Sequence, residues 1–386
     1  MNKITFEQKI RDLESESYAV CERLLSKKIV ILPAGRAHRL AIVELSHFDI
    51  WADFLADKNP KTSRGGTGCW SFHDRQYTAE QTDQVIARYG NTVNYMITSR
   101  PFWTEIKNYL LESGIKNENI FSAPARMGAL VPGTSFKRRF EIWRSFDEIM
   151  KSADLLEDDV SRMELWDLLS VFCVNAPVWH ETEPSEEYFN TPYLSLGENE
   201  VFVDAGMYDG MTSRRFAELC PTYKYIYGIE ANPQNMDQIY RNLEGYRDVH
   251  IKNNALCNSE MMLKFSAKGV GIEGARLLEK GEMEVKGIRG DSLNIAPTFI
   301  KFDVEGAEYD ALMGFQHTIR KYRPKMAVSV YHSLEDHWRL IQTVKEICPD
   351  YCLYLKHHYG YEDLYGTILY AEVKESTGGK IRERKE

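Results

Sequence analysis

The residues with the clearest chemical potential lie in one short stretch of the chain. The run Asp-Ala-Gly-Met-Tyr-Asp-Gly over residues 204–210 follows the apolar residues 201–203 and precedes a helical pattern from Met211 to Leu219. Glycine lets the backbone turn sharply and approach a ligand closely, and the start of a helix offers free N–H groups to an anion. The stretch predicts a strand, a turn that can bind a ligand, and a helix.

An acidic residue strengthens this prediction. Glu230 ends the apolar run 225–229 and lies 24 residues beyond Gly206. A carboxylate about 20 residues past a glycine turn, at the end of the next strand, can accept hydrogen bonds from ribose hydroxyls. The alternative is an ordinary exposed carboxylate at a strand end.

The spacing of the glycines distinguishes between cofactors. Dinucleotide sites favour G-x-G-x-x-G, in which the second glycine makes room for a pyrophosphate. Here the pattern is D-x-G-x-x-x-G, with Met207 and Tyr208 in the middle. These side chains would crowd a pyrophosphate, and the pattern better suits a ligand that presents a single carboxylate, such as S-adenosylmethionine.

Three further residues are candidates for acid–base chemistry. Asp303 and Glu305 follow the apolar run that ends at Phe302, and His332 follows the strand pattern 326–331. Carboxylates at a strand end can both face a cleft where the strand loosens into a turn, and histidine titrates near neutral pH. A histidine bonded to a backbone carbonyl is an equally good interpretation of His332. His337 and the pair His357-His358 are weaker candidates.

Four segments, in order, resemble the FkbM-type methyltransferases over residues ~186–372. They are residues 204–210, Glu230-Ala231-Asn232-Pro233, Asn254-Ala255-Leu256, and Ile300-Lys301-Phe302-Asp303-Val304-Glu305-Gly306-Ala307-Glu308. The resemblance implies a class I methyltransferase that uses S-adenosylmethionine and acts on a hydroxyl oxygen. Many members have a small residue and Asn where Met207 and Tyr208 stand, a difference that we expect to alter the shape of the pocket.

The resemblance also implies roles for individual residues. Asp204, Gly206 and Gly210 would hold the methionine moiety, Glu230 the ribose, and Asn254 with Ala255 the adenine. The turn at Asp303 would lie over the transferred methyl group. The full set that we expect to contact the cofactor is Asp204, Ala205, Gly206, Gly210, Glu230, Ala231, Asn254, Ala255 and Asp303.

A metal-assisted reaction is an open alternative. Asp303 and Glu305 could bind Mg²⁺, since hard cations favour carboxylates. We expect no metal, because two carboxylates at this position can instead cap the following helix or hold the amino group of the cofactor. The acidic residues between His332 and His337 are typical of the first turn of a helix.

These residues require parallel strands to position them. The strand patterns in the second half are 201–204, 225–230, 249–252, 261–265, 298–303, 325–331, 351–355 and 365–371. Strands alternating with helices imply βαβ units and a parallel sheet. We therefore predict an α/β fold, with a Rossmann-like methyltransferase domain over residues 186–375 and a tail over 376–386.

The first half predicts a separate unit. Strand patterns at 28–32, 50–55 and 94–98 alternate with helical ones near 79–89 and 101–113, which predicts a smaller Rossmann-like domain over residues 1–125. It could bind a nucleotide or sugar nucleotide, through Gly35-Arg36, Asp53 with Asp57, or the loop 65–68, or it could bind no ligand.

A helical connector and linker would span residues 126–185. Apolar residues three or four apart in residues 136–149 form the stripe of an amphipathic helix. In a second helix, Ser161 and Glu164 have the spacing of a capping box, with Val160 and Leu165 as its hydrophobic staple.

Composition limits the class of protein. The 386 residues carry 48 Lys and Arg against 57 Asp and Glu, a net charge of −9, which argues against nonspecific nucleic-acid binding. No run approaches the roughly 18 apolar residues of a membrane span. Seven cysteines without a CxxC pair predict free thiols in a reducing cytoplasm. The oligomeric state cannot be read, and a homo-oligomer is one option.

Our leading hypothesis is a cytoplasmic O-methyltransferase that acts on a sugar hydroxyl in glycan or natural-product biosynthesis. Its partner would be a small-molecule or glycan acceptor. A nicotinamide-dependent oxidoreductase is the second hypothesis, favoured by Glu230 and opposed by the missing third glycine. A noncatalytic nucleotide-binding module is the third.

Overall fold

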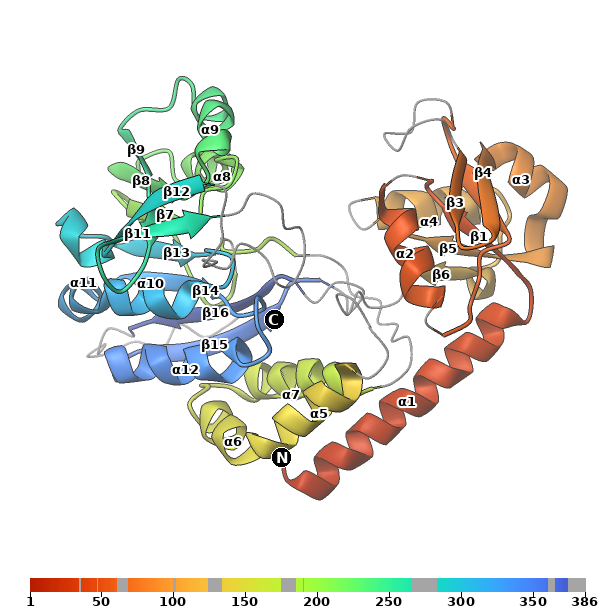
Figure 1. Ribbon diagram of the computed structural model, residues 1–386, viewed down its shortest axis with the longest axis horizontal. Coiled ribbons are helices and arrows are strands. Elements are labelled where there is room, and N and C mark those ends of the chain that lie inside the picture. Colours follow the sequence, from red (N-terminus) through yellow and green to blue (C-terminus); the bar gives the residue numbers. More distant parts are fainter. Residues whose placement is uncertain are drawn as a thin grey trace. The chain divides into compact units, whose positions relative to one another are not determined.

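The chain forms two compact units in the computed structural model, each described here by itself (Figure 1). The first unit comprises Met1–Ser145, Trp166–Pro184 and Tyr359–Leu364, and the second comprises Phe146–Leu165, Ser185–His358 and Tyr365–Glu386. The structure describes residues 1–34, 36–46, 48–60, 69–99, 102–123, 134–174, 185–189, 191–265, 283–359 and 365–373.

The first unit contains a six-stranded sheet in the order β3-β4-β2-β1-β5-β6. All neighbouring strands are parallel except the pair β3–β4. The strands are β1 (Lys28–Leu32), β2 (Phe54–Asp57), β3 (Cys69–Phe72), β4 (Arg75–Gln81), β5 (Val93–Ile97) and β6 (Ile120–Ser122). Strand β5 is buried along its whole length, as expected for a parallel strand with another strand on each side.

The helices of this unit include one that our sequence interpretation missed. Helix α1 (Lys3–Leu25) is capped by Asn2, whose side chain accepts a hydrogen bond from the N–H of Thr5 at 2.9 Å. The others are α2 (Arg36–Ser46), α3 (Thr82–Tyr89), α4 (Trp103–Glu112), α5 (Thr134–Arg144) and the 3₁₀ turns η1 (Gly90–Thr92) and η2 (Asn117–Asn119). Helix α1 buries few residues, among them Phe6, Ile10 and Leu24, so its apolar stripe is sparse.

The second unit is built on a seven-stranded sheet in the order β15-β16-β14-β13-β7-β8-β9. Strands β9, β8, β7, β13 and β14 are mutually parallel, and β16 runs antiparallel to both of its neighbours. Its strands are β7 (Val201–Ala205), β8 (Tyr225–Glu230), β9 (Val249–Asn253), β13 (Phe299–Phe302), β14 (Lys325–Ser329), β15 (Cys352–His357) and β16 (Thr367–Glu372). This arrangement confirms the predicted α/β, Rossmann-like fold class.

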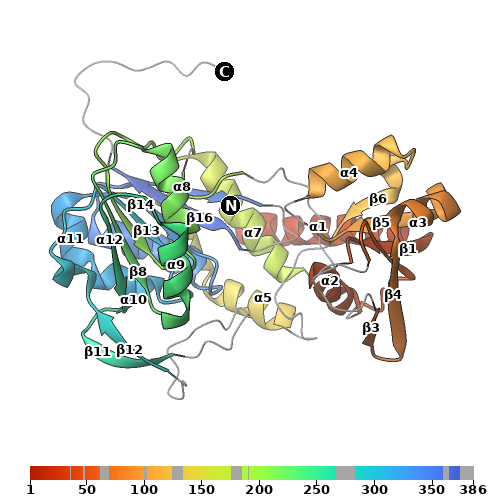
Figure 2. The same cartoon turned by 90° about the horizontal axis from the view of Figure 1, so that it is seen from above.

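Helices cover both faces of this sheet. Figure 2 shows α8 (Met211–Leu219) and α9 (Met236–Asn242) on one face, and α10 (Glu308–Gly314), α11 (Gln316–Tyr322) and α12 (Asp336–Ile347) on the other. Phe202, Phe216 and Phe299 form the aromatic centre of the first interface, with the rings of Phe202 and Phe216 stacked at 4.3 Å between centroids. Such packing fixes the ends of β7 and β13 relative to α8.

A small three-stranded sheet extends the second unit. Strand β12 (Met283–Ile288) lies between β10 (Ala255–Leu256) and β11 (Met261–Phe265). The strand β11 was predicted, whereas β10 and β12 were not. The 3₁₀ turns η3 (Pro233–Asn235) and η4 (Gly290–Leu293) complete this unit.

Two local predictions were wrong. Strand β2 begins at Phe54 rather than at residue 50, because Asp53 turns its carboxylate to accept the N–H of Ile29 at 2.8 Å. The capping box at Ser161 does not form. Asp158 caps the N–H of Ser161 at 2.8 Å instead, and α7 (Asp159–Cys173) therefore begins earlier than the box required. Helix α6 (Phe146–Asp154) and helices α5 and α7 occupy the predicted helical segment 136–175.

The structure includes no helix long and apolar enough to cross a membrane among the residues it describes.

Candidate active site

The chemical residues of the second unit gather at the carboxyl edge of its parallel sheet. Strand β7 is followed in the chain by its neighbour β8, while β13 lies on its other side, so the strand order reverses between β7 and β13. Open parallel sheets bind ligands outside the carboxyl ends of their strands at such a point. Gly206 and Asp303 follow the two strands there.

The turn after β7 requires glycine at Gly206. Its φ is +87°, and a Cβ placed on it would lie 1.7 Å from the carbonyl oxygen of Asp303. A side chain at this position would therefore both strain the backbone and collide with β13's end. Gly210, with φ +83°, precedes α8, whose first N–H groups have no partner within the helix. The close approach that the structure shows is to the backbone after β13, whereas the approach to a ligand stays a prediction.

The residue pair in the middle of the turn does not behave as predicted. Met207 is 1% exposed and packs in a buried cluster with Ile239 and Leu243, so its side chain fills the core under the turn. Tyr208 is 70% exposed and has a positive φ of 52°. Of the two residues that depart from the family pattern, only Tyr208 presents its side chain to solvent at this edge.

Glu230 ends β8 next to this turn and is 8% exposed. Its Oε2 accepts the N–H of Tyr208 at 2.9 Å, and its Oε1 accepts the N–H of Asn232 at 2.8 Å. Burial raises the pKa of Glu230 above its usual value, although these hydrogen bonds favour the carboxylate. The side chain therefore braces the glycine turn. Oε1 also accepts a hydrogen bond from the side-chain amide of Asn235 at 3.3 Å, so Oε2 is the oxygen with a lone pair left for a ligand hydroxyl.

The predicted adenine-pocket residues adjoin Glu230. The N–H of Asn254 donates to the carbonyl of Glu230 at 3.1 Å, and its side-chain amide donates to the carbonyl of Lys286 at 3.0 Å. Ala255 is 8% exposed in β10, and Ala231 packs against the same small cluster. The structure brings these residues together beside the end of β8.

Asp204 lies behind the turn rather than at its surface. It is fully buried, and its two oxygens are used within the chain, by Lys301 Nζ at 3.0 Å and by the hydroxyl of Ser213 at 2.7 Å. Ala205, beside it, is also fully buried. A direct contact between the Asp204 carboxylate and a cofactor is therefore not what this geometry offers.

Lys301 is the residue of this site that sequence reasoning missed. It is 2% exposed, and its Nζ donates to Asp204 at 3.0 Å and to the carbonyl of Gly206 at 2.7 Å, while Asp303 lies 3.8 Å away. Burial alone would lower the pKa of Lys301, but the two aspartates hold it above the usual value. A buried ammonium thus joins the end of β7, the glycine turn and the end of β13.

Asp303 is held between two tyrosines. Tyr331 donates its hydroxyl to Oδ1 at 3.0 Å and Tyr188 donates to Oδ2 at 3.1 Å. Burial would raise the pKa of Asp303, but Lys301, His332 and the two hydroxyls outweigh it and keep the pKa below its ordinary value. The side chain is 23% exposed, so this oriented carboxylate is accessible from the carboxyl edge.

His332 meets three carboxylates. Its Nδ1 lies 3.0 Å from Glu308 Oε1, and its Nε2 lies 3.6 Å from both Asp303 Oδ1 and Glu305 Oε2. Burial opposes the imidazolium, but the carboxylates raise the pKa of His332 to about 9. The interpretation of His332 as a histidine bonded to a backbone carbonyl is wrong, because side-chain carboxylates surround it.

The turn between β13 and α10 is tied by Glu308, not by the residues that the sequence singled out. Glu308 Oε1 accepts the N–H of Val304 at 2.8 Å and lies 3.4 Å from the N–H of Gly306. Glu305 has a positive φ of 57°, and its side chain is 64% exposed, so it stands at the rim of the site. The expectation that Asp303 and Glu305 cap the following helix is therefore wrong.

The other histidines are bonded elsewhere in the second unit. His337 is buried at the start of α12, as the acidic first turn predicted. His358 contacts the hydroxyl of Tyr370 at 2.6 Å and Ser185 Oγ at 2.9 Å, and His357 contacts the hydroxyl of Thr367 at 2.9 Å. None of these contacts involves Asp303, Glu305 or His332.

The candidate residues of the first unit are only partly described. Asp53 accepts a hydrogen bond from the N–H of Ile29, and Asp57 accepts one from the N–H of Asn59 at 2.8 Å. Both carboxylates are therefore bonded to the backbone of the first unit. Gly35, the side chain of Arg36 and the loop 65–68 lie outside the described residues.

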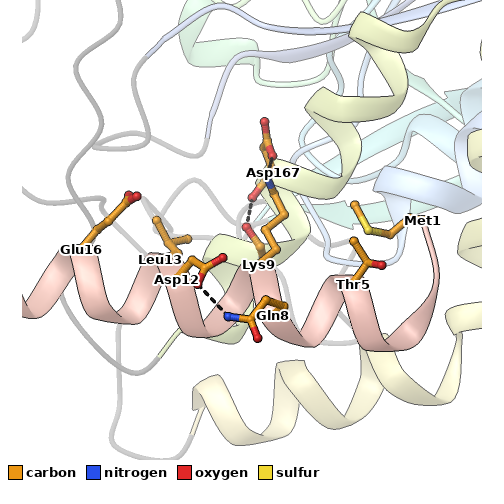
Figure 3. Close-up of a pocket in the computed structure, with 9 residues that line it drawn as sticks. Met1, Thr5, Gln8, Lys9, Asp12, Leu13, Glu16 and Asp167 are labelled. Carbon is orange, nitrogen blue, oxygen red and sulfur yellow. Dashed lines mark hydrogen bonds and ion pairs between the residues drawn. The ribbon is translucent and has the colours of Figure 1, made fainter.

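A shallow pocket of about 480 Å³ lies in the first unit, along α1 and α7, where Lys9 and Asp167 form an ion pair (Figure 3). Its lining is Met1, Thr5, Gln8, Lys9, Asp12, Leu13, Glu16, Asp167 and Ser170. None of the candidate catalytic or cofactor residues is among them.

The carboxyl edge of the second unit suits S-adenosylmethionine. The turn at Gly206 brings its backbone directly against the end of β13, and Glu230 offers a carboxylate oxygen beside this turn. Asp303, Glu305 and Glu308 lie around His332, next to this turn. Their negative charge would attract the sulfonium and ammonium groups of the cofactor. The residues present therefore fit this cofactor.

Comparison with solved structures supports the fold of the whole chain. The crystal structure of a methyltransferase FkbM from Methylobacillus flagellatus KT matches with a TM-score of 0.59 at 18% identity, covering 96% of this chain and 100% of that one. At this identity the similarity establishes the fold alone.

Two other solved structures match only part of the chain. Aeropyrum pernix fibrillarin, in complex with natively bound S-adenosyl-L-methionine, matches with a TM-score of 0.31 at 14% identity, covering 46% of this chain and 69% of that one. A SAM-dependent methyltransferase from Aquifex aeolicus matches with a TM-score of 0.30 at 11% identity, covering 47% and 85%. No curated protein matches the chain.

The family comparison concerns the second unit. Residues 204–362 match the model of the methyltransferase FkbM domain, which confirms the resemblance predicted from the four segments. S-adenosylmethionine is the cofactor expected of such a domain. The match spans the glycine turn, Glu230, the Asp303 turn and His332, and residues 204–362 of this chain are therefore a methyltransferase FkbM domain.

Proposed function

We propose that the second unit transfers a methyl group from S-adenosylmethionine to a hydroxyl oxygen, on a sugar acceptor in glycan or natural-product biosynthesis. One observation carries the proposal. The glycine turn at Gly206 lies directly against the end of β13, where Asp303 and His332 stand together. A cofactor seated on that turn would present its methyl group beside groups able to handle the proton of a hydroxyl.

The cofactor roles follow the geometry of the turn. The backbone of the turn from Gly206 to Gly210 would border the methionine moiety, and Glu230 would accept from the ribose while still bracing Tyr208. Ala231, Asn254 and Ala255 would border the adenine. Asp204 and Ala205 would not touch the cofactor. Asp204 would instead fix Lys301, which donates to the carbonyl of Gly206.

Proton handling falls to Asp303, Glu305 and His332. When bound, S-adenosylmethionine supplies a methyl group on a cationic sulfur, and the new O–C bond forms as the S–C bond breaks and the hydroxyl proton leaves to a base. Asp303 is the carboxylate best oriented to receive that proton, because Tyr188 and Tyr331 fix it and Lys301 keeps it ionised. His332 and Glu305 would hold the acceptor beside it.

The proposed acceptor class has its own grounds. A sugar hydroxyl rests on the family resemblance and on the presence of the first unit, a mostly parallel sheet of the kind that can bind a nucleotide. The described cysteines are free thiols, which is compatible with the reducing cytoplasm that the sequence predicted.

A methyl-transfer assay tests the proposal. Purified full-length protein is incubated with S-adenosylmethionine labelled in its methyl group and a panel of hydroxylated acceptors, including sugars and sugar nucleotides. We expect label on an oxygen of one acceptor class, with activity falling at least about 100-fold in Asp303→Asn if it acts as a general base. Asp237→Asn, an exposed carboxylate of α9, is the matched control and should keep full activity.

Binding measurements separate the competing functions. Thermal unfolding is followed with S-adenosylmethionine, S-adenosylhomocysteine or NAD, and a ligand at ~100 times its Kd adds about 2.7 kcal/mol of stability. A shift with NAD alone would support a nicotinamide-dependent oxidoreductase and refute the methyltransferase. Binding of the two S-adenosyl ligands without transfer to any acceptor would indicate a noncatalytic module.

A further inference from the structure

Three side chains at the carboxyl edge have the arrangement of metal ligands. Asp303, Glu308 and His332 each offer one ligand atom, and these atoms all lie within 4.8 Å of one another. Around a six-coordinate ion with bonds of about 2.1 Å, adjacent ligand atoms are about 3 Å apart and opposite ones about 4.2 Å. Small side-chain rotations would therefore place all three on one ion.

Glu308 has an oxygen that the protein itself does not satisfy. The residue is fully buried, and Oε1 accepts the N–H of Val304 at 2.8 Å. Oε2 is also buried but has no hydrogen-bond partner among the described residues. A buried carboxylate oxygen left without a partner is costly, and a bound cation would supply the missing partner.

The charges around this cluster leave room for a cation. Asp303, Glu305 and Glu308 all lie within 3.6 Å of a ring nitrogen of His332. Lys301 lies beside the cluster, but its ammonium is bonded to Asp204 at 3.0 Å and is 3.8 Å from Asp303. Asp336 adds a further carboxyl group on this side, close enough that the charges of Glu308 and His332 affect its pKa.

Neighbouring groups already orient the ligands, as they do in metal sites. Tyr188 and Tyr331 donate hydroxyl hydrogen bonds to Asp303, at 3.1 and 3.0 Å. Such outer contacts fix the direction of a ligand and are worth 10–100-fold in metal affinity. The Glu305 side chain, 64% exposed, marks the open side, where water or an acceptor oxygen could complete the shell.

We propose that Asp303, Glu308 and His332 bind one divalent transition-metal ion. Two carboxylates with one imidazole suit Mn²⁺, Fe²⁺ or Zn²⁺ better than they suit Ca²⁺ or Mg²⁺, which prefer ligands that are all oxygen. The role of the ion rests on the proposed function, since an ion here would bind the acceptor hydroxyl and make it easier to deprotonate. The sequence analysis weighed Asp303 with Glu305, and His332 with His337, and predicted no metal. The fold instead brings Asp303 and His332 together with Glu308.

Mn²⁺ binding tests this site without relying on turnover. Metal-stripped full-length protein is titrated with Mn²⁺, and free Mn²⁺ is measured by electron paramagnetic resonance. We expect one ion per chain, with affinity at least about 10-fold weaker in Asp303→Asn and in His332→Gln. Glu335→Gln removes an exposed carboxylate three residues from His332 and should bind Mn²⁺ as the wild type does.

The outcomes separate this inference from the proposed function. Because Glu308 also holds the turn, the decision rests on Asp303→Asn and His332→Gln, with their folding checked by circular dichroism. Equal Mn²⁺ affinity in these variants and the wild type would overturn the site, since the ion would then be held by other carboxylates. If wild-type protein binds S-adenosylmethionine but no Mn²⁺, the metal site fails and the proposed function stands. If it binds Mn²⁺ as expected but no S-adenosylmethionine, the reverse holds.

Discussion

The buried lysine Lys301, paired with Asp204, joins several parts of this site. The register of β7 and β13 places the two residues directly opposite each other, although they lie 97 positions apart in the chain. Neither side chain reaches solvent, so each charge depends on the other. Lys301 then carries this constraint forward to the Gly206 carbonyl.

Replacing Lys301 should therefore cost stability. Lys301→Met leaves Asp204 buried without its counter-charge, and breaking a buried ion pair in this way costs about 3–5 kcal/mol. Urea unfolding measures the change, with Arg214→Met as the control, because the Arg214–Glu218 pair is exposed and contributes little to stability. The double variant Asp204→Leu with Lys301→Met should recover part of the loss. A Lys301→Met change within 1 kcal/mol of wild type would contradict the pairing.

The requirement for glycine at Gly206 has a matched comparison within the chain. Gly245 has nearly the same φ, +86° against +87°, but a Cβ there would meet nothing within 4 Å. Gly245→Ala should therefore cost only the backbone strain of about 1–2 kcal/mol. Gly206→Ala adds the collision with Asp303, and we expect a larger loss of stability together with loss of S-adenosylmethionine binding. Equal effects of the two substitutions would show that the close approach of the strands does not matter.

At the scale of elements, the strands and their ends could be predicted better than the side-chain network. Apolar runs ending in Asp, Glu or Gly mark β7, β8 and β13, and all eight strands predicted in the second half are present. The strands β3, β4, β6, β10 and β12 were not predicted, and β6 and β10 have only three and two residues, too few to show a period. Helix α1 was missed because its buried residues are few among charged ones.

The residues missed at the site depended on which strands are neighbours. Lys301 interrupts the apolar run Phe299-Ile300-Lys301-Phe302, and a lysine inside a buried strand signals a hidden anionic partner. The sequence could have raised that question but could not name Asp204. Similarly, Glu308 was quoted in the family segment, but only the turn geometry shows it beneath His332.

The pairing of β15 and β16 predicts an acid-sensitive element. His358, just after β15, is buried against Tyr370, and burial, with help from Lys356 and His357, lowers its pKa from 6.5 to about 3. The unfolded chain therefore binds a proton below pH 6.5 that the folded one refuses until about pH 3. The contribution of neutral His358 to the free energy of unfolding is fully present above pH 6.5. It falls by up to about 1.4 kcal/mol per pH unit as the pH drops from 6.5 to about 3.

A variant isolates the contribution of this histidine. His358→Gln keeps a polar group near Tyr370 but cannot titrate, so the slope of unfolding free energy between pH 6.5 and 4 should be shallower than in wild type. His337, with a pKa lowered by burial to about 4, contributes a separate part of the slope and remains in the variant. Parallel curves for wild type and His358→Gln, measured by urea unfolding, would exclude His358 as a source of the acid sensitivity.

At the scale of the whole molecule, the chemistry belongs to one of two units. The second unit holds residues 204–358 of the family match, with the glycine turn and the charged cluster. The first unit has its own sheet and its own buried core, so it does not depend on these residues for its fold. From the net charge of −9 we predicted no nonspecific nucleic-acid binding, and this stays a prediction. The charge is compatible with a site whose own carboxylates favour a cationic cofactor.

The binding of S-adenosylmethionine at the end of β8 tests the account most directly. Isothermal titration calorimetry of the full-length protein should show one S-adenosylmethionine per chain. Glu230→Ala should weaken binding at least about 10-fold, because it removes the ribose acceptor and the brace on Tyr208. Asp237→Ala, an exposed carboxylate on the adjacent helix, should leave the affinity unchanged. No binding by the wild type, or equal affinity in Glu230→Ala, would contradict the placement of the cofactor at this edge.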